Sequence, residues 1–325
     1  MGNDLCGLVL NSMLKVALSL IVIITVALFV FIKMHSAQDI PLEQLKPRWA
    51  SSASSFINID GLTLHVRDEG PKSDTTPIVL VHGTGASLHT WDGWVTGLKG
   101  ERRIIRFDLP GFGLTGPEPQ NDYTIEKYTD YLVKLLNHLD IEHAIVAGNS
   151  LGGYIGWATA VRYPEKVSQL VLIDASGYPY NAESVPIAFK LSQNKFAKFF
   201  LKDFIPKFIV RSSVENVYGD PSLVSDELVN RYYELALREG NRAAISERFV
   251  QTQPGKLRHE LNTLSVPTLL IWGGKDKLIP LEMGKQFERD IPNSTLVVFD
   301  DLGHVPHEED PEATLAATLA FIDKH

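Results

Sequence analysis

The residues with the clearest chemical potential form a Gly-x-Ser-x-Gly motif near the middle of the chain. The motif consists of Gly148, Asn149, Ser150, Leu151 and Gly152. An apolar, strand-like run precedes it and a helix-compatible segment follows it, which is the context in which such a motif exposes a nucleophilic serine. Gly148 and Gly152 leave room for the close backbone approach that this turn requires. The motif therefore predicts Ser150 as a nucleophile; the alternative is an ordinary Gly-rich turn.

A serine hydroxyl is a weak nucleophile, so it requires a base that a carboxylate orients. After a strand–turn–helix motif of this kind, the partners follow in the order Asp or Glu and then His. Asp276 and His304 each follow a late strand-like run, in that order. We therefore predict Ser150 as nucleophile, His304 as base and Asp276 as orienting acid. Asp174 remains an alternative acid, and His307 a competing base.

The oxyanion formed by attack on a carbonyl needs two N–H donors. One donor is expected from Leu151, directly after the nucleophile, and the other from the loop after an early strand. That loop contains His82, Gly83, Thr84 and Gly85. Thr84 N–H is the candidate donor, and the flanking glycines allow close backbone approach. His82 precedes the acid in the chain, so we expect it to brace the loop rather than to act as the base.

Short runs rich in Val, Ile and Leu must position these residues. They occur at 78–81, 103–107, 144–147, 170–173, 268–272 and 296–299. Helical periods lie between several of them, the clearest one from Ile125 to Leu139. Strands that alternate with helices predict a parallel sheet covered on both faces. Alternating apolar residues around Asp60-Gly61 predict a hairpin before the first of these units.

The interval from about Tyr178 to Pro254 shows helical patterns only. Such an insertion is expected over the carboxyl ends of the strands, where open α/β sheets bind ligands. Within it, residues 189–208 interleave phenylalanines with lysines. This pattern favours a lid helix whose aromatics pack on the core, and the alternative is a basic amphipathic face on a membrane surface.

The N-terminal region has a different composition. Val16 to Ile32 is an uninterrupted apolar run that, with Met13 and Leu14, is long enough to cross a bilayer. A cleaved signal peptide is the rival interpretation, but Lys33 occupies the place where a cleavage region should be neutral. We therefore expect an uncleaved anchor. Residues 36–55, with two prolines and a serine-rich run, are typical of a linker.

Composition excludes some classes of function. The 325 residues carry a net charge of −8, which argues against a nucleic-acid partner. The single cysteine, Cys6, precludes an intrachain disulfide. No spacing of metal ligands is visible, and the predicted chemistry needs no cofactor. The sequence assigns no oligomeric state.

Taken together, these motifs resemble the α/β-hydrolase superfamily over roughly residues 56–325. The resemblance implies an eight-stranded, mostly parallel sheet with helices on both faces and a helical cap inserted after the sixth strand. The expected organisation is an anchor at 13–35, a linker at 36–55, a hydrolase core at 56–177 and 255–325, and a cap at 178–254.

The resemblance also limits the chemistry. Haloalkane dehalogenases and epoxide hydrolases use an aspartate nucleophile, which Ser150 excludes. Carbon–carbon bond hydrolases of aromatic catabolism share the Gly-Asn-Ser elbow, but Gly85-Ala86-Ser87 departs from their usual Gly-Pro-Gly continuation. Perhydrolase-like members share the triad as well. The expected activity is an esterase or lipase that acts on a small-molecule or lipid ester reached from the membrane. Carbon–carbon bond hydrolysis and a non-catalytic binding role stay as alternatives.

Overall fold

The structure of the chain is a computed structural model, which describes all residues except 1, 35 and 194–204. Its centre is an eight-stranded sheet in the order β1-β2-β4-β3-β5-β6-β7-β8. The strands are β1 (Ser54–Ile59), β2 (Leu62–Glu69), β3 (Ile78–Val81), β4 (Ile104–Phe107), β5 (Ala144–Asn149), β6 (Val167–Ile173), β7 (Thr268–Gly273) and β8 (Ser294–Phe299). β2 pairs antiparallel with β1 and β4, and the other pairs are parallel. The predicted α/β-hydrolase sheet is thus confirmed.

The predicted hairpin is present between β1 and β2. Its two turn residues, Asp60 and Gly61, have φ angles of 52° and 85°. Two successive residues with positive φ match the twist of the flanking strands, which explains the Asp-Gly pair at this position. The hairpin adds two antiparallel strands to one edge of the parallel sheet.

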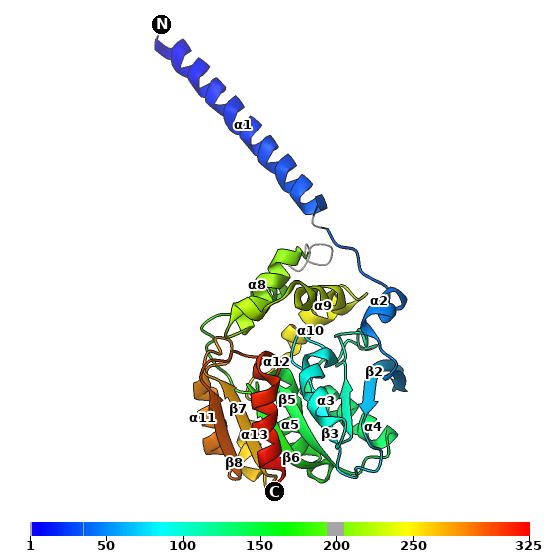
Figure 1. The fold of residues 1–325 in the computed structure, drawn as a ribbon. Helices are drawn as coiled ribbons and strands as arrows, with labels where there is room; N and C mark the ends of the chain where they lie inside the picture. Colours follow the sequence, from blue (N-terminus) through cyan, green and yellow to red (C-terminus); the bar gives the residue numbers. More distant parts are fainter. Residues whose placement is uncertain (1, 35, 194–204) are drawn as a thin grey trace.

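Helices cover both faces of the sheet (Figure 1). They are α3 (Asp92–Leu98), α4 (Ile125–His138), α5 (Leu151–Arg162), α11 (Leu281–Asp290) and α13 (Pro311–Ile322), and the short α12 (Pro306–Glu309) packs on α3 and α13. Side chains along β3 alternate between two cores: Val79 and Val81 pack with residues of α4, α5 and α11, whereas Ile78 and Leu80 pack with residues of α3 and α13. Burial on both faces explains why the strands are apolar throughout rather than alternating.

Between β6 and β7, the described residues form helices and no strand. These helices are α6 (Ile187–Gln193), α8 (Lys207–Val217), α9 (Asp226–Ala236) and α10 (Asn241–Gln251), and we call this part of the chain the cap. Short 3₁₀ helices occupy Leu88–Trp91, Pro164–Lys166, Pro221–Leu223 and Arg258–Thr263. Figure 1 shows α8, α9 and α10 together at one end of the sheet. Most of the interleaved Phe and Lys residues expected on a lid helix lie at 194–204, outside the described residues.

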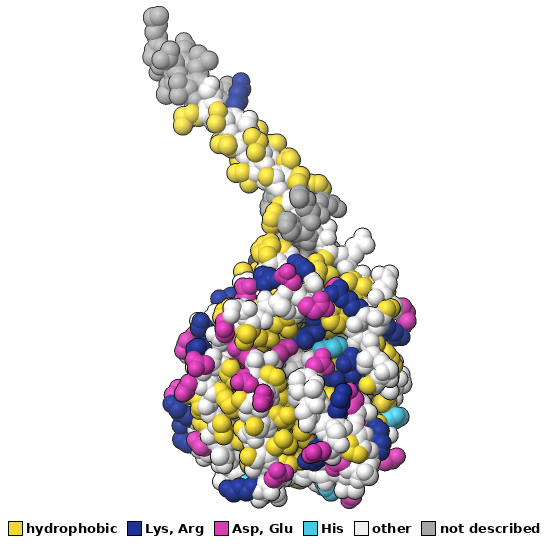
Figure 2. Space-filling model, viewed as in Figure 1, with side chains coloured by type: hydrophobic (Ala, Val, Ile, Leu, Met, Phe, Trp, Pro, Cys, Tyr) yellow, Lys and Arg dark blue, Asp and Glu magenta, His cyan; other side chains and the backbone are white. Residues whose placement is uncertain are grey.

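Helix α1 (Gly2–Met34) extends away from the rest of the molecule (Figure 1). Its apolar stretch, Ser12–Phe31, has 20 residues and none of its described side chains is buried. Figure 2 shows hydrophobic side chains along this stretch, whereas charges of both signs are interspersed over the rest of the visible surface. By length and composition the helix can cross a membrane, a property that it shares with signal sequences.

The range expected to be a linker contains a helix, α2 (Leu42–Trp49), with Pro47 inside it. Proline removes a backbone donor and clashes with the preceding turn, so local propensity disfavours this helix. Leu45 and Trp49 are nevertheless buried, and they pack with Leu114 of the core and Leu235 of the cap. Tertiary burial of these two side chains therefore overrides the local signal, and residues 42–49 are part of the folded domain.

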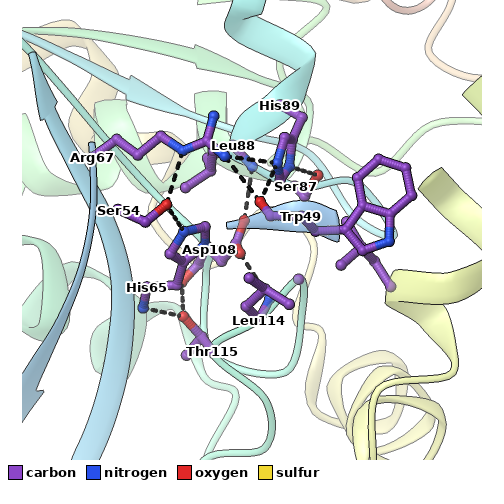
Figure 3. Close-up of polar contacts among 12 residues, drawn as sticks. Trp49, Ser54, His65, Arg67, Ser87, Leu88, His89, Asp108, Leu114 and Thr115 are labelled. Atoms are coloured by element: carbon purple, nitrogen blue, oxygen red, sulfur yellow. Dashed lines mark hydrogen bonds and ion pairs between the residues drawn. The ribbon is translucent and has the colours of Figure 1, made fainter. Parts of the chain in front are cut away.

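A buried polar network joins the end of α2 to the core (Figure 3). Trp49 O accepts hydrogen bonds from Arg67 Nη2 and His89 Nε2, both at 2.9 Å. Asp108 lies at the centre of the network: its Oδ2 accepts from His65 Nδ1 at 2.7 Å, and its Oδ1 accepts from Leu88 N at 2.8 Å. Burial by itself raises the pKa of Asp108, but the charge of the neighbouring His65 and its hydrogen bond outweigh this effect and bring the pKa well below its usual range. Asp108 is therefore an ionised carboxylate in the core.

We expect Asp108→Ala to lower the free energy of unfolding by about 3–5 kcal/mol, because it leaves buried donors unpaired. Since the folded pKa of Asp108 is lowered, its contribution is complete above the usual carboxyl pKa and declines as the pH falls below about 4. Denaturant titration of the full chain at several pH values measures both effects. Asp226→Ala removes a carboxylate whose side chain is 90% exposed and should change stability by less than about 0.5 kcal/mol. Equal losses in the two variants would contradict the assignment.

Candidate active site

Ser150 sits on the sharp turn between β5 and α5. Its φ of 54° is positive, a conformation that costs free energy in any residue with a side chain. Two contacts hold it there: Ser150 N donates to Ile173 O at 2.9 Å, and Ser176 N donates to Ser150 O at 3.0 Å. The turn thus directs a nearly buried serine, 8% exposed, to the carboxyl edge of the sheet.

The two motif glycines lie where a side chain would collide with the backbone. A Cβ on Gly148 would lie 2.2 Å from Gly152 O, and a Cβ on Gly152 would lie 2.0 Å from Val81 O. The second distance shows that the backbone at Gly152 lies directly against the end of β3. Because Gly152 has no side chain, the loop after β3 and the turn at Ser150 can lie side by side.

His304 and Asp276 form a buried pair after β8 and β7. His304 Nδ1 lies 2.7 Å from Asp276 Oδ2. The other carboxylate oxygen of Asp276 accepts from Leu278 N at 2.7 Å and Ile279 N at 2.9 Å. Three hydrogen bonds therefore fix the carboxylate, and the carboxylate in turn fixes the plane and tautomer of the imidazole. This is the arrangement that a Ser-His-Asp triad needs between its acid and its base.

The loop that carries His304 has further contacts that sequence reasoning missed. Asn149 Nδ2 donates to His304 O at 2.9 Å, so the nucleophile turn and the histidine loop are joined directly. Glu309 accepts from Gly303 N at 2.7 Å and from Gly219 N at 2.8 Å, which ties the same loop to the cap. Glu309 belongs to no motif, and its partner in the cap lies 90 residues away, so no local signal could have identified it.

Asp174, the alternative acid, lies beside the pair rather than in it. One carboxylate oxygen each of Asp174 and Asp276 and one ring nitrogen of His304 all lie within 4.8 Å of one another. Burial first, and then the charge of Asp276 and a hydrogen bond to it, raise the pKa of Asp174 well above its usual value. Two carboxyl groups at this separation do not both ionise readily. Asp174 therefore keeps its proton to a higher pH than a free carboxyl group does, and Asp276 is the acid that faces the histidine.

His307, the competing base, packs against Trp91 with ring centroids 4.1 Å apart. Burial lowers the pKa of His307 to about 3, so its ring is neutral at physiological pH. Neither of its ring nitrogens has a hydrogen-bond partner within the described part of the chain. The structure thus places His304, and not His307, against Asp276.

The loop after β3 approaches the nucleophile. A Cβ on Gly83 would lie 3.2 Å from Ser150 Cβ. His82 braces this loop: Nδ1 donates to Gly83 O at 2.8 Å, and Nε2 accepts from Leu109 N at 2.9 Å. Burial lowers the pKa of His82, which keeps the ring in this neutral, donor-and-acceptor form. Thr84, the predicted oxyanion donor of this loop, lines the same cavity as Ser150, and Leu151 follows Ser150 as the first residue of α5.

A cavity of about 530 Å³ lies between the core and the cap. Ser150, His304 and Thr84 line it at the core side. Its apolar lining includes Phe112, Phe189, Val210, Val214, Leu278 and Val305. Such a cavity has the size and character of a small-molecule site, with a few polar groups that converge on one point.

In comparisons with known proteins, this chain is similar to hydrolases. A model of the alpha/beta hydrolase fold family matches residues 76–311. Hydrolase YugF of Bacillus subtilis is 31% identical, over 82% of this chain and 96% of the relative. The 2-hydroxy-6-oxo-2,4-heptadienoate hydrolase of Pseudomonas putida is 30% identical, over 75% of this chain and 87% of the relative.

Two solved structures share the fold. A meta-cleavage product hydrolase from Pseudomonas fluorescens superposes with a TM-score of 0.72 at 25% identity, over 83% of this chain and 97% of the other. A membrane phospholipase A described as a bacterial virulence factor superposes with a TM-score of 0.72 at 23% identity, over 100% of this chain and 99% of the other. The second likeness concerns the fold alone, and it extends over the full length of the chain.

Proposed function

This chain belongs to the alpha/beta hydrolase fold family, and we propose that it is a membrane-anchored serine hydrolase that cleaves carboxylic esters bearing an acyl chain. The observation that carries the proposal is the apolar cavity of about 530 Å³ over Ser150 and His304. An acyl chain in this cavity would bury apolar surface while its ester carbonyl meets the polar groups at the core side. Helix α1 supports delivery from a membrane, since its apolar stretch has the length to span one.

The proposed reaction begins with transfer of the Ser150 proton to His304 as Ser150 Oγ attacks the ester carbonyl. Asp276 stabilises the imidazolium that forms, through the 2.7 Å contact to Nδ1. The N–H groups of Thr84 and Leu151 hold the oxyanion, and each such donor typically contributes a factor of roughly 100 to 1,000 in kcat. His304 then protonates the departing alcohol. Water hydrolyses the acyl-enzyme by the reverse path and releases the acid.

Carbon–carbon bond hydrolysis is the second candidate. Its support is the name of the relative from Pseudomonas putida, a 2-hydroxy-6-oxo-2,4-heptadienoate hydrolase 30% identical to this chain. The same nucleophile, base and oxyanion donors would serve a ketone that loses a carbon leaving group. The two candidates differ in the bond cleaved, and therefore in the substrates that turn over.

A substrate panel tests the proposal on the full chain in non-ionic detergent. The panel contains p-nitrophenyl esters of graded acyl length and a 2-hydroxy-6-oxo-dienoate, whose loss of absorbance reports carbon–carbon cleavage. We expect kcat/KM to rise by about tenfold for each two or so methylenes that enter the cavity, until it is filled. Turnover of the dienoate without turnover of any ester, by folded protein, would replace ester hydrolysis with the second candidate.

A further inference from the structure

In the described part of the chain, one charged side chain lines the cavity. Among the described lining residues, Arg242 of α10 is the only one that carries a permanent charge. It is 8% exposed, and the other described lining residues from the cap are apolar or neutral. A guanidinium in an apolar wall is costly unless its N–H groups are paired, so its hydrogen bonds decide what it is for.

Asp39 accepts hydrogen bonds from only two of the three nitrogens of the Arg242 guanidinium. Nε donates to Asp39 Oδ1 at 3.0 Å, and Nη2 donates to the same oxygen. Nη1 is buried and has no hydrogen-bond partner in the described part of the chain. Nε and Nη2 form the edge of the planar group that faces Asp39, so the two N–H groups of Nη1 point away from that carboxylate.

Asn241, the neighbouring residue in α10, also lines the cavity and carries a complementary unused atom. Its Nδ2 donates to Gly113 O at 3.0 Å and to Leu235 O at 2.8 Å. Two carbonyl acceptors fix the orientation of the amide, so the unpaired, buried atom is the acceptor Oδ1. Two adjacent lining residues of one cavity thus carry a charged donor and a neutral acceptor, both buried, that lack hydrogen-bond partners within the described residues.

The chain that leaves α1 runs directly behind this wall. Ile40 N donates to Leu237 O at 2.7 Å, and Glu239 N donates to Ile40 O at 3.0 Å. Asp39 Oδ2 accepts from Gly240 N at 3.3 Å. These contacts place residues 39–40 against the turn between α9 and α10. The polar part of the cavity wall thus lies beside the segment that follows the apolar helix.

We propose that Arg242 and Asn241 form an anion-binding subsite of this cavity, which selects esters that carry a phosphate or carboxylate group. Arg242 Nη1 donates to the oxyanion of the substrate, and Asn241 Oδ1 accepts from a hydroxyl or ammonium group beside it. The inference rests on the proposed ester hydrolysis and adds the substrate class: an amphipathic ester whose acyl chain lies in the apolar part of the cavity and whose anionic group meets α10. A neutral ester leaves Nη1 unpaired, and this difference is the source of selectivity.

Binding of unreactive probes tests the subsite independently of catalysis. The full chain in non-ionic detergent is titrated with octyl phosphate, octanoate and octanol by calorimetry. We expect Arg242→Met to lower the affinity for octyl phosphate by roughly tenfold to a hundredfold, because a hydrogen bond to a charged group is lost. The affinity for octanol should fall much less. Arg242→Lys should retain part of the affinity. Phosphate and octanoate arms show which oxyanion the subsite prefers.

Asp39→Asn separates anion binding from a structural role of the ion pair. It keeps Arg242 but removes the negative charge that competes with the ligand, so octyl phosphate should bind more tightly than to the wild-type chain. If Arg242 serves only to hold residues 39–40, both variants should weaken binding alike, and the proposal fails. Arg211→Met, which removes an arginine of α8 outside the cavity, controls for long-range attraction and should leave the octyl phosphate affinity within about twofold.

Kinetics links the subsite to the reaction. The substrates are 1-octanoylglycerol, its 3-phosphate and the octanoyl ester of glyceric acid, which share an acyl chain and differ in charge. We expect the ratio of kcat/KM for the anionic to the neutral ester to fall about tenfold or more in Arg242→Met, mainly through KM. An unchanged ratio with unchanged octyl phosphate binding overturns the subsite even if esters are hydrolysed. Intact, Arg242-dependent probe binding with no ester turnover overturns the proposed reaction and leaves the subsite standing.

Discussion

Ser150→Ala is expected to lower kcat for ester hydrolysis by about 10,000-fold or more, because the covalent route through the serine oxygen is lost. The residual rate would come from the oxyanion donors and from substrate positioning. The fold should be retained, because the backbone of residue 150, and not its side chain, makes the hydrogen bonds to Ile173 O and Ser176 N that hold the turn. Stopped-flow or steady-state assays on the full chain measure the loss.

Two comparisons make this result specific. A fluorophosphonate should add its mass to wild-type Ser150 and not to the Ser150→Ala chain, as intact-protein mass spectrometry detects. Ser168→Ala removes a hydroxyl from β6 outside the cavity and should leave kcat within about twofold. Retention of a tenth or more of the wild-type rate by the Ser150→Ala chain would remove Ser150 as the nucleophile.

Asp276→Asn should lower kcat by about 10,000-fold, whereas Asp174→Asn should change it by less than about tenfold. An amide at position 276 can place its NH2 donor against His304 Nδ1, which favours the wrong tautomer of the imidazole. It also carries no charge that could stabilise the imidazolium. At position 174 the raised pKa favours the neutral acid, and an amide has the same shape and no charge. Its oxygen can still accept from Gly273 N, which lies 3.0 Å from Asp174 Oδ1. A pH–rate profile for both variants checks the assignment.

Stability gives an independent readout of the same pair. The folded pKa of Asp174 is raised, so this group stabilises the fold below its unfolded pKa, and that contribution is lost as the pH rises toward the folded pKa. Asp174→Asn does not titrate at this position, so its stability should rise relative to that of the wild-type chain as the pH rises above about 4. Thermal unfolding at acidic and mildly alkaline pH measures the difference. A large loss of kcat in Asp174→Asn with little loss in Asp276→Asn would exchange the roles of the two acids.

The fold could be predicted from local patterns. Apolar runs of strand length, the Asp60-Gly61 turn and the periodicity from Ile125 to Leu139 each depend on residues within one turn or strand of one another. For this reason the strands appear where they were expected, and the hairpin has the positive φ angles that its sequence requires. Helix α2 shows the limit of this reasoning, because burial of Leu45 and Trp49 against distant residues outweighs the local effect of Pro47.

By itself, then, the sequence determined the family, the elbow at Ser150 and the order of the candidate acid and base, since spacing along the chain encodes all three. Only the tertiary structure shows that Asp276 rather than Asp174, and His304 rather than His307, form the hydrogen-bonded pair, because this pairing depends on which loop ends meet at the sheet edge. The same holds for Arg242, whose partner Asp39 lies 203 residues away. Charge and hydrogen bonding act through space over a few ångströms, so a pair this far apart in the chain leaves no periodic trace in the sequence.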